Sequence, residues 1–330
     1  MTSSSNRQDG RVEGMPAAPV LRPAGKPLTA AATALALTTA FLWGGTAVSN
    51  QFAVDQLPPL MVGGLRFFLA GLFMLPWCLV ERAPIGITRA QWKPVLVMAA
   101  LLFLQIGTFN IGGKWSTSSH ASLFVNTYIF WVAGVEHFVT RTIRLGWRAI
   151  LGLAIAGIGV ALLVLSTAKP AATAASGMDT PTLSGDLILL LSGLILGVKV
   201  LYTKDAVRQI APGTVILWHD FLGAAMFFVA SALTEPMPTS APTWPTIWAM
   251  LYGGFVVSGF CFAAHAFQLR TYGASQISVF SFTTPVFGVG LGVLLRGDAL
   301  SPWLLVCGVA VAVGITLVNL PEGSEAEALE

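Results

Sequence analysis

The chain has 330 residues, of which 55% are hydrophobic and only 10% are charged, and its mean hydropathy is +0.75. Soluble domains average about 25% charged residues, so this composition argues against a soluble protein, and it is too apolar for a disordered one. The net charge of +3 does not imply nucleic-acid binding, because in a membrane protein the positions of Lys and Arg matter more than their sum. The composition predicts a polytopic membrane protein.

The first 29 residues are polar and rich in Pro and Ser, and we interpret residues 1–29 as a disordered cytoplasmic tail without the features of a signal peptide. Apolar blocks of about twenty residues follow, long enough to cross a hydrocarbon core roughly 30 Å thick. The ten blocks are 30–54, 60–80, 94–113, 120–140, 148–167, 184–203, 213–235, 246–267, 273–296 and 301–320. Continuous blocks exclude a transmembrane barrel, whose strands alternate. The predicted fold is an all-α integral membrane bundle of ten transmembrane helices.

The distribution of Lys and Arg along the chain predicts the orientation of the protein in the membrane. With a cytoplasmic N-terminus, 13 of these residues fall on the cytoplasmic side and 3 on the other, while Arg66 and Lys199 lie inside spans. This asymmetry agrees with the positive-inside rule. We therefore expect both termini, including the acidic tail 321–330, on the cytoplasmic side of the plasma (inner) membrane.

The polar segment 168–183 is rich in small residues and contains prolines. We predict that it is a linker between two five-helix halves, 30–167 and 184–320. An offset of 153 positions superposes Gly44 on Gly197 and Pro59 on Pro212. Because each half has an odd number of spans, the second half enters the membrane from the opposite side. Inverted repeats of this kind are typical of secondary transporters with a substrate site near the midplane.

Short motifs resemble those of the drug/metabolite transporter superfamily, specifically its EamA-like ten-helix permeases. The motifs are Leu42-Trp43-Gly44, Leu57-Pro58-Pro59, Leu65-Arg66-Phe67, Thr284-Pro285-Val286-Phe287 and Leu295-Arg296-Gly297-Asp298. Asp298 stands where the family usually has Glu, and the proline that the family has near Tyr128 or Ile129 is missing. The resemblance covers about 30–320 and implies transport, with a cavity among spans one, three, four, six, eight and nine.

Polar and aromatic side chains recur at helical spacing in these spans. We predict that they line a substrate cavity with apolar walls and a few orienting polar groups. The set is Trp43, Thr46, Asn50, Gln105, Phe109, Asn126, Phe130, Lys199, Tyr202, Ser258, Phe262, His265, Phe280 and Thr283. The alternative for each polar member is that it holds helices together.

Charged residues inside spans suggest function by default. Lys199 either binds substrate, snorkels to the interface or pairs with Asp220 at similar depth. Arg66 is interpreted mainly as structural, although its guanidinium could bind an anionic group. Glu136 lies near the cytoplasmic end of span four and close to Arg141 and Arg144 in the sequence, so it is expected to form an interfacial ion pair.

His137 and His265 are the candidate proton carriers, since imidazole titrates near neutral pH. The three cysteines lie inside apolar blocks, which predicts lipid-facing or packing roles and no metal site. No cofactor is expected.

The leading hypothesis is a secondary transporter, with export as the expected direction, for a small metabolite such as an amino acid or related compound. Its expected partners are the lipid bilayer, a small-molecule substrate and a second copy of the chain in a homodimer, and no nucleic-acid partner is expected. The rival readings are a membrane-embedded enzyme and a non-transporting scaffold. The sequence has no Walker-type motif, no HExxH and no Gly-x-Ser-x-Gly elbow, so we expect no enzyme.

Overall fold

The computed structural model describes residues 29–141, 145–168, 180–271, 280 and 283–319. Within these ranges the chain is helical and contains no β-strand, which agrees with the predicted fold class. The elements are α1 (Ala30–Val54), α2 (Pro59–Glu81), η1 (Arg89–Gln91), α3 (Trp92–Lys114), α4 (Ser118–Asn126), α5 (Tyr128–Gly134), η2 (Val135–Val139), α6 (Trp147–Ala168), α7 (Leu183–Gln209), α8 (Pro212–Thr234), α9 (Trp244–Leu251), η3 (Tyr252–Cys261), α10 (Phe262–Thr271), α12 (Thr283–Arg296) and α13 (Pro302–Asn319).

Local sequence signals set several helix ends. The hydroxyl of Thr29 accepts a hydrogen bond from the Ala32 amide at 3.2 Å, and Thr182 caps α7 in the same way. Pro59 and Pro212 occupy the first turns of α2 and α8, where a missing N–H costs no helical hydrogen bond. The second helix of each half therefore begins with a proline.

Within the described ranges, seven helices are long and apolar enough to cross a membrane. They are Ala30–Val54, Pro59–Glu81, Arg89–Lys114, Trp147–Ala168, Leu183–Gln209, Pro212–Thr234 and Trp244–His265. Two shorter apolar helices, Thr283–Arg296 and Pro302–Val318, correspond to the predicted ninth and tenth blocks, and part of the ninth block lies outside the described residues. The predicted fourth block is divided among α4, α5 and η2.

Two spans depart from regular α-helix. Between α4 and α5, Thr127 donates its hydroxyl hydrogen to the Phe124 carbonyl at 2.6 Å, and the Asn126 amide donates to the Ser122 carbonyl at 2.7 Å. Side chains that bond to their own backbone in this way compete with the helical ladder. The eighth span is π-helical from Tyr252 to Cys261, a feature that is frequent at functional sites.

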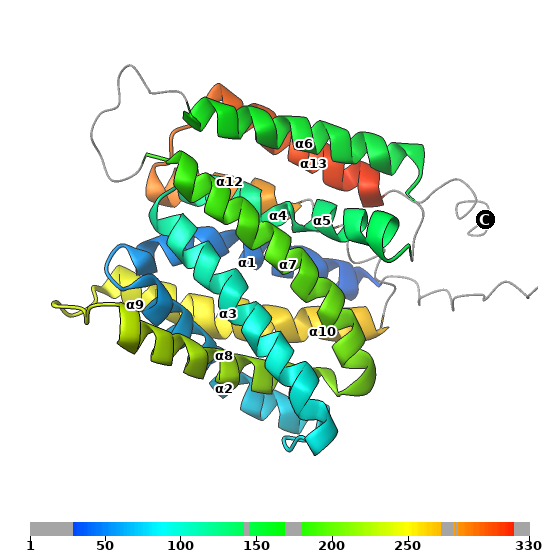
Figure 1. Ribbon diagram of the computed structural model, residues 1–330, viewed down its shortest axis with the longest axis vertical. Helices are drawn as coiled ribbons and strands as arrows, with labels where there is room; N and C mark the ends of the chain where they lie inside the picture. The colour runs from blue at the N-terminus through cyan, green and yellow to red at the C-terminus, as the bar shows by residue number, and fades with distance from the viewer. Residues whose placement is uncertain (1–28, 142–144, 169–179, 272–279, 281–282, 320–330) are drawn as a thin grey trace, which may run out of the picture.

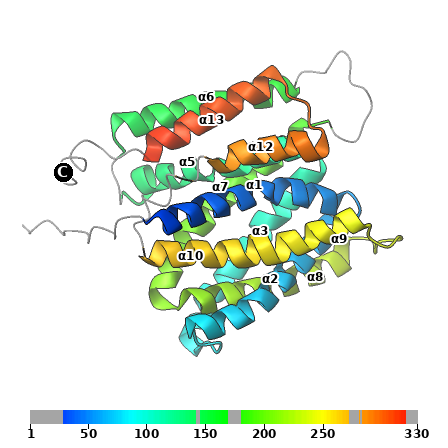
Figure 2. The ribbon, with the colours of Figure 1, turned by 180° about the vertical axis from the view of Figure 1, so that it is seen from behind.

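The helices form a bundle with two pairs at its opposite edges. Helices α6 and α13 pack along one edge, while α2 and α8 lie at the other, and the remaining helices fill the space between them (Figures 1 and 2). Helix α1 begins and α13 ends at the same end of the bundle, whereas α7 begins at the opposite end (Figure 1). Helices of the first half pack extensively on helices of the second: α1 on α12, α2 on α8, α3 on α7 and α6 on α13.

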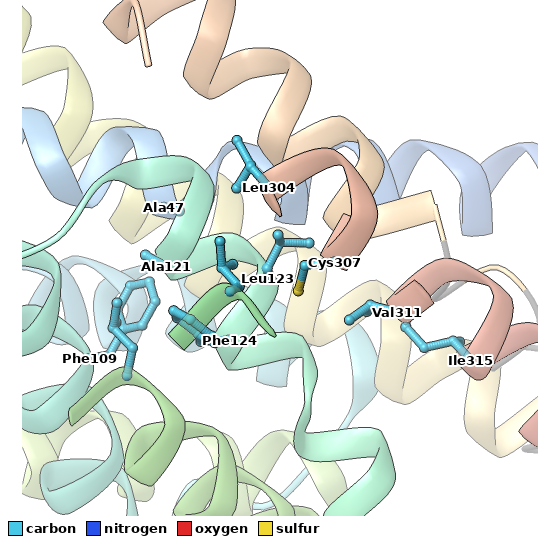
Figure 3. Packing of buried hydrophobic residues seen from close by; sticks show 11 residues of the cluster. Ala47, Phe109, Ala121, Leu123, Phe124, Leu304, Cys307, Val311 and Ile315 are labelled. Carbon is cyan, nitrogen blue, oxygen red and sulfur yellow. The ribbon is translucent and has the colours of Figure 1, made fainter. Parts of the chain in front are cut away.

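An apolar core joins these layers. Helix α13 contributes Leu304, Cys307, Val311 and Ile315, which lie near Leu123 and Phe124 of α4, with Phe109 and Ala47 beyond them (Figure 3). All three cysteines are free and buried. Of the two predicted roles, lipid-facing or packing, the structure supports packing.

Replacing Gly152 by Ala is expected to lower the melting temperature, because an added Cβ would lie 2.8 Å from the carbonyl oxygen of Gly314 on α13. Overpacking of this kind costs about 1–3 kcal/mol. Gly157, also on α6, has nothing within 4 Å of its added Cβ, so Gly157→Ala is the matched control and gains helix propensity of about 1 kcal/mol. Thermal unfolding of the purified protein in detergent measures both; equal melting of the two variants would contradict the packing argument.

Candidate functional site

A polar path runs from α3 to α7 inside the bundle. The side-chain amide of Gln105 donates to the Ser192 hydroxyl at 3.3 Å, and that hydroxyl donates to the main-chain carbonyl of Gln105 at 2.8 Å. The Lys199 ammonium donates to Gln105 Oε1 at 3.5 Å. All three side chains are buried, so these residues present a cation and an amide to the interior.

Aromatic rings from α1 and α10 extend this path. The Lys199 Nζ lies 5.7 Å from the ring centroid of Phe262, a cation–π arrangement. Trp43 meets Phe262 edge-on at 5.8 Å and His265 at 5.0 Å between ring centroids. Five predicted site residues, Gln105, Lys199, Phe262, Trp43 and His265, are therefore connected through successive contacts across α3, α7, α10 and α1.

Arg66 adds a second cation from α2. Its Nε donates to the Ser258 hydroxyl at 2.8 Å and to the Gly253 carbonyl at 3.2 Å, both on η3. Ser258 is itself a predicted site residue and precedes Phe262 by about one helical turn. Arg66 therefore contacts a member of the predicted set. The interpretation of Arg66 as structural is compatible with these bonds, but its Nη1 is buried without a hydrogen-bond partner.

Arg66, Lys199 and Asp220 form what we call the buried charge cluster, with exposed fractions of 4%, 4% and 1%. Asp220 interacts electrostatically with both cations. In the described part of the chain, however, neither cation lies close enough to Asp220 for a direct ion pair. Asp220 Oδ1 is 2.8 Å from His219 Nδ1, but the angles do not make a hydrogen bond, and Asp220 Oδ2 has no partner.

Two small cavities flank this region, each of about 10 Å³, which is room for about one water molecule. The Arg66 cavity is lined by Ser49, Asn50, Ala53, Val62, Arg66, Ala249, Met250 and Gly253. The His265 cavity is lined by Ala36, Thr39, Ala40, Trp43, His265, Phe280 and Thr284. Helix α1 borders both, and Tyr252 of η3 donates its hydroxyl to the Leu42 carbonyl at 2.6 Å and packs on Gly45.

Other predicted residues take different positions. Phe109 belongs to the apolar core, and Phe130 packs against that core close to Gly314 of α13. Tyr202 packs on an apolar cluster of α3, α7 and α8. Asn126 bonds to its own helix. These four do not join the contacts that link Lys199 to Trp43.

The remaining members lie nearer the cavities. Asn50 borders the Arg66 cavity, and Phe280 borders the His265 cavity. The Thr283 hydroxyl donates to the Phe280 carbonyl at 2.7 Å, and the Thr46 carbonyl accepts from Ser49 at 3.1 Å. The side chain of Thr283 and the backbone carbonyl of Thr46 are therefore engaged in local bonds.

His137 and Glu136 lie in η2, at one end of their span. His137 Nδ1 accepts a hydrogen bond from the Leu145 amide at 3.0 Å. Glu136 forms an ion pair with Lys204 of α7 at 2.9 Å, a partner other than the neighbouring arginines that the sequence suggested.

A buried network of side chains was missed by the sequence reasoning. The carboxylate of Asp186 accepts hydrogen bonds from Ser116 at 2.6 Å and Thr167 at 2.9 Å, and it lies 3.0 Å from His120 Nδ1. The available signal was position, because His120 and Asp186 both stand at the start of apolar blocks on the same side of the predicted membrane. The network joins α4, α6 and α7 to the segment between α3 and α4, which contains Ser116.

Asp298 also has a definite place. Its carboxylate accepts hydrogen bonds from the Ser118 hydroxyl and the Ser119 amide, both at 2.7 Å. A carboxylate at a helix N-terminus satisfies free N–H groups and the helix dipole. Among the described residues, no three His, Cys, Asp or Glu side chains gather in a way that could hold a metal ion.

The chain is similar to known transporters over most of its length. Residues 31–165 and 183–320 match the EamA-like transporter family. The uncharacterized transporter YoaV of Bacillus subtilis (strain 168) is 23% identical over 280 residues, covering 84% of this chain and 93% of YoaV. The uncharacterized inner membrane transporter YedA of Escherichia coli (strain K12) is 24% identical over 287 residues, covering 82% and 86%.

A third relative has a named substrate. The S-adenosylmethionine/S-adenosylhomocysteine transporter of Chlamydia muridarum is 21% identical over 293 residues, covering 86% of this chain and 90% of that protein. A solved crystal structure covers 92% of this chain and 100% of its own, with a TM-score of 0.64 at 18% identity. This structure shares the fold.

Proposed function

The chain belongs to the EamA-like transporter family, and from this premise we propose that it is a secondary transporter that exports a small metabolite such as an amino acid or related compound. That it is a multi-pass membrane transporter follows from the family and from relatives named as transporters. The observation that carries the finer proposal is the buried charge cluster. Charges within spans are costly, by roughly 2.5–3.5 kcal/mol on insertion scales, and typically mark a substrate or ion path.

The proposed architecture is ten spans in two inverted repeats, 30–167 and 184–320. Three observations support it: the family matches once in each half, α1 and α7 begin at opposite ends of the bundle, and helix contacts correspond between the halves. Thus α1 packs on α12 as α7 packs on α4 and α5, and α2 packs on η3 as α8 packs on α3. Such symmetry permits alternating access by rocking of elements around a midplane site.

The substrate site in this proposal lies between the halves. Trp43, Arg66 and Gln105 come from the first half, while Lys199, Asp220 and Phe262 come from the second. A site at this interface would be exposed to each side of the membrane in turn when the halves change their relative position. The predicted residues outside these contacts, Phe130 and Tyr202 among them, stay predictions for an open conformation.

Two observations support an amino-acid-like substrate. The buried charge cluster holds two cations and one carboxylate, which favours a ligand with a negative group. One relative is named for S-adenosylmethionine and S-adenosylhomocysteine, and both of these molecules carry an amino-acid head group.

The proposed orientation places both termini in the cytoplasm. The Lys and Arg asymmetry supports it, and the start of α1 and the end of α13 lie at the same end of the bundle (Figure 1). Energy would come from an ion gradient or from exchange, with His265, beside Trp43, and His137 as the candidate proton carriers.

Flux into proteoliposomes tests the proposal. We expect saturable uptake of at least one labelled compound from a panel of L-amino acids, S-adenosylmethionine, S-adenosylhomocysteine and small organic acids. Uptake should rise with a proton gradient or with unlabelled substrate on the opposite side. Protein-free liposomes are the control. Linear, non-saturable uptake of every compound, equal to that of the control, would contradict the proposal.

A further inference from the structure

Arg66 lines the Arg66 cavity and carries a donor without a partner. Its Nε is held by Ser258 and the Gly253 carbonyl, which fixes the guanidinium plane between α2 and η3. Its Nη1 is buried and has no hydrogen-bond partner. A guanidinium matches a carboxylate in geometry and charge, so this unused donor is suited to bind a carboxylate oxygen.

Asn50 brings a free acceptor to the same cavity. Asn50 lies on α1 and is buried, and its Oδ1 has no hydrogen-bond partner. The other lining residues are mostly small or apolar, including Ala53, Ala249 and Gly253. The residues that line one cavity therefore include an unpaired cationic donor and an unpaired neutral acceptor in mostly apolar surroundings.

The charge balance favours an anion in this region. Arg66 and Lys199 carry two positive charges and Asp220 one negative charge, and all three side chains are buried. Unbalanced charge is costly in a medium of low dielectric constant, and a ligand carboxylate would neutralise the excess cation.

We propose that the Arg66 cavity is the subsite for the head group of an α-amino acid or a derivative of one. Arg66 Nη1 binds the carboxylate, and Asn50 Oδ1 accepts a hydrogen bond from the neighbouring ammonium group. This inference rests on the proposed transport function and names the group that the transporter recognises. The cavity has room for about one water molecule, so the head group enters when η3 separates from α1 at the contact between Tyr252 and Leu42.

Competition against flux tests the subsite in the full chain reconstituted in proteoliposomes. The labelled substrate is the compound that gives saturable flux. The unlabelled competitors are L-phenylalanine and L-leucine, and each is compared with its α-carboxamide. In the wild type, the acid should compete at least about tenfold better than the amide, as expected for a charge-assisted hydrogen bond. In Arg66→Gln this preference should vanish, and Arg66→Lys should retain part of it. Arg208→Gln, which removes an exposed cation of α7, is the control and should keep the preference.

A variant at a second position keeps the proposal testable if the Arg66 variants do not fold. Asn50→Leu is close in size to Asn50 and loses no hydrogen bond at Oδ1. It should weaken competition by L-phenylalanine at least about threefold while leaving that by 3-phenylpropionate, which lacks the ammonium, unchanged, because a neutral hydrogen bond contributes about 0.5–1.5 kcal/mol.

Equal competition by acid and amide in the wild type, or equal weakening of both by Arg66→Gln, would overturn the subsite while saturable flux upholds the transporter. Absence of saturable flux for every compound would overturn the transport function and the subsite with it.

Discussion

Replacing Lys199 by Met is expected to reduce saturable flux at least about 30-fold, because loss of a buried charged partner costs 2 kcal/mol or more. Lys199 is buried between Gln105 and the ring of Phe262, where the low dielectric constant strengthens its attraction for a negative group. Methionine keeps the length and apolar stem of the side chain, so the change removes mainly the charge. Initial rates in proteoliposomes at equal protein density measure the effect.

Lys204→Met is the matched control on the same helix. Lys204 is 58% exposed and pairs with Glu136 at 2.9 Å, and surface pairs of this kind contribute about 0–1 kcal/mol. Its flux should equal that of the wild type. Undiminished flux in Lys199→Met would remove Lys199 from the site and leave transport itself unaffected.

A double variant separates the two interpretations of Lys199. If Lys199 only balances the charge of Asp220, then Lys199→Met combined with Asp220→Asn should restore flux, because no unbalanced carboxylate remains. If Lys199 contacts substrate, flux should stay low in the double variant even when its melting temperature returns to that of the wild type. The second result is the one expected from the contacts with Gln105 and Phe262.

Replacing Asp186 by Asn is expected to destabilise the protein by about 1–3 kcal/mol, the usual cost of leaving buried hydrogen-bonding groups without a partner. Asp186 is fully buried and receives hydrogen bonds from Ser116 and Thr167, with His120 at 3.0 Å. An asparagine has one acceptor oxygen in place of two and carries no charge, so it leaves some of these groups unpaired. Thermal unfolding in detergent measures the effect as a lower melting temperature.

Asp205→Asn provides the comparison on the same helix. Asp205 is 68% exposed and lies 3.4 Å from Arg208, which is also exposed. Its loss should change the stability by less than about 1 kcal/mol. Similar melting of the two variants would show that the Asp186 network does not hold α4, α6 and α7 together.

Hydropathy predicted most helix positions because burial in lipid requires continuous apolar segments. The first block, 30–54, has the bounds of α1, and block 213–235 differs from α8 by one residue at each end. Helix α7 continues six residues past its predicted end at 203, to Gln209. The last turns of α7 are polar. Hydropathy identifies the end of the apolar segment, but the backbone stays helical beyond it.

The breaks in the fourth and eighth spans could not be predicted in the same way. The change at Thr127 depends on a hydroxyl bonding to its own backbone, and no glycine or proline marks it. The π-helical segment Tyr252–Cys261 depends on packing against α1 and α2, which periodicity does not report.

Helical spacing identified faces of single helices, but it could not tell which faces meet. Gln105 and Lys199 do meet, and Trp43 does reach Phe262. Tyr202 shares a face with Lys199 by spacing, yet it packs on the apolar cluster around Met98. The partner of Arg66 could not be read from the sequence, because Ser258 is 192 positions away.

That separation has a consequence for biosynthesis. Arg66 enters the membrane with the second span, whereas Ser258 is synthesised 192 residues later. At about 5–20 residues per second, the delay is roughly 10–40 s. During this interval the guanidinium has neither Ser258 nor, for most of the time, Asp220 beside it. The nascent chain therefore needs water, lipid headgroups or the insertion machinery to solvate Arg66 until the second half arrives.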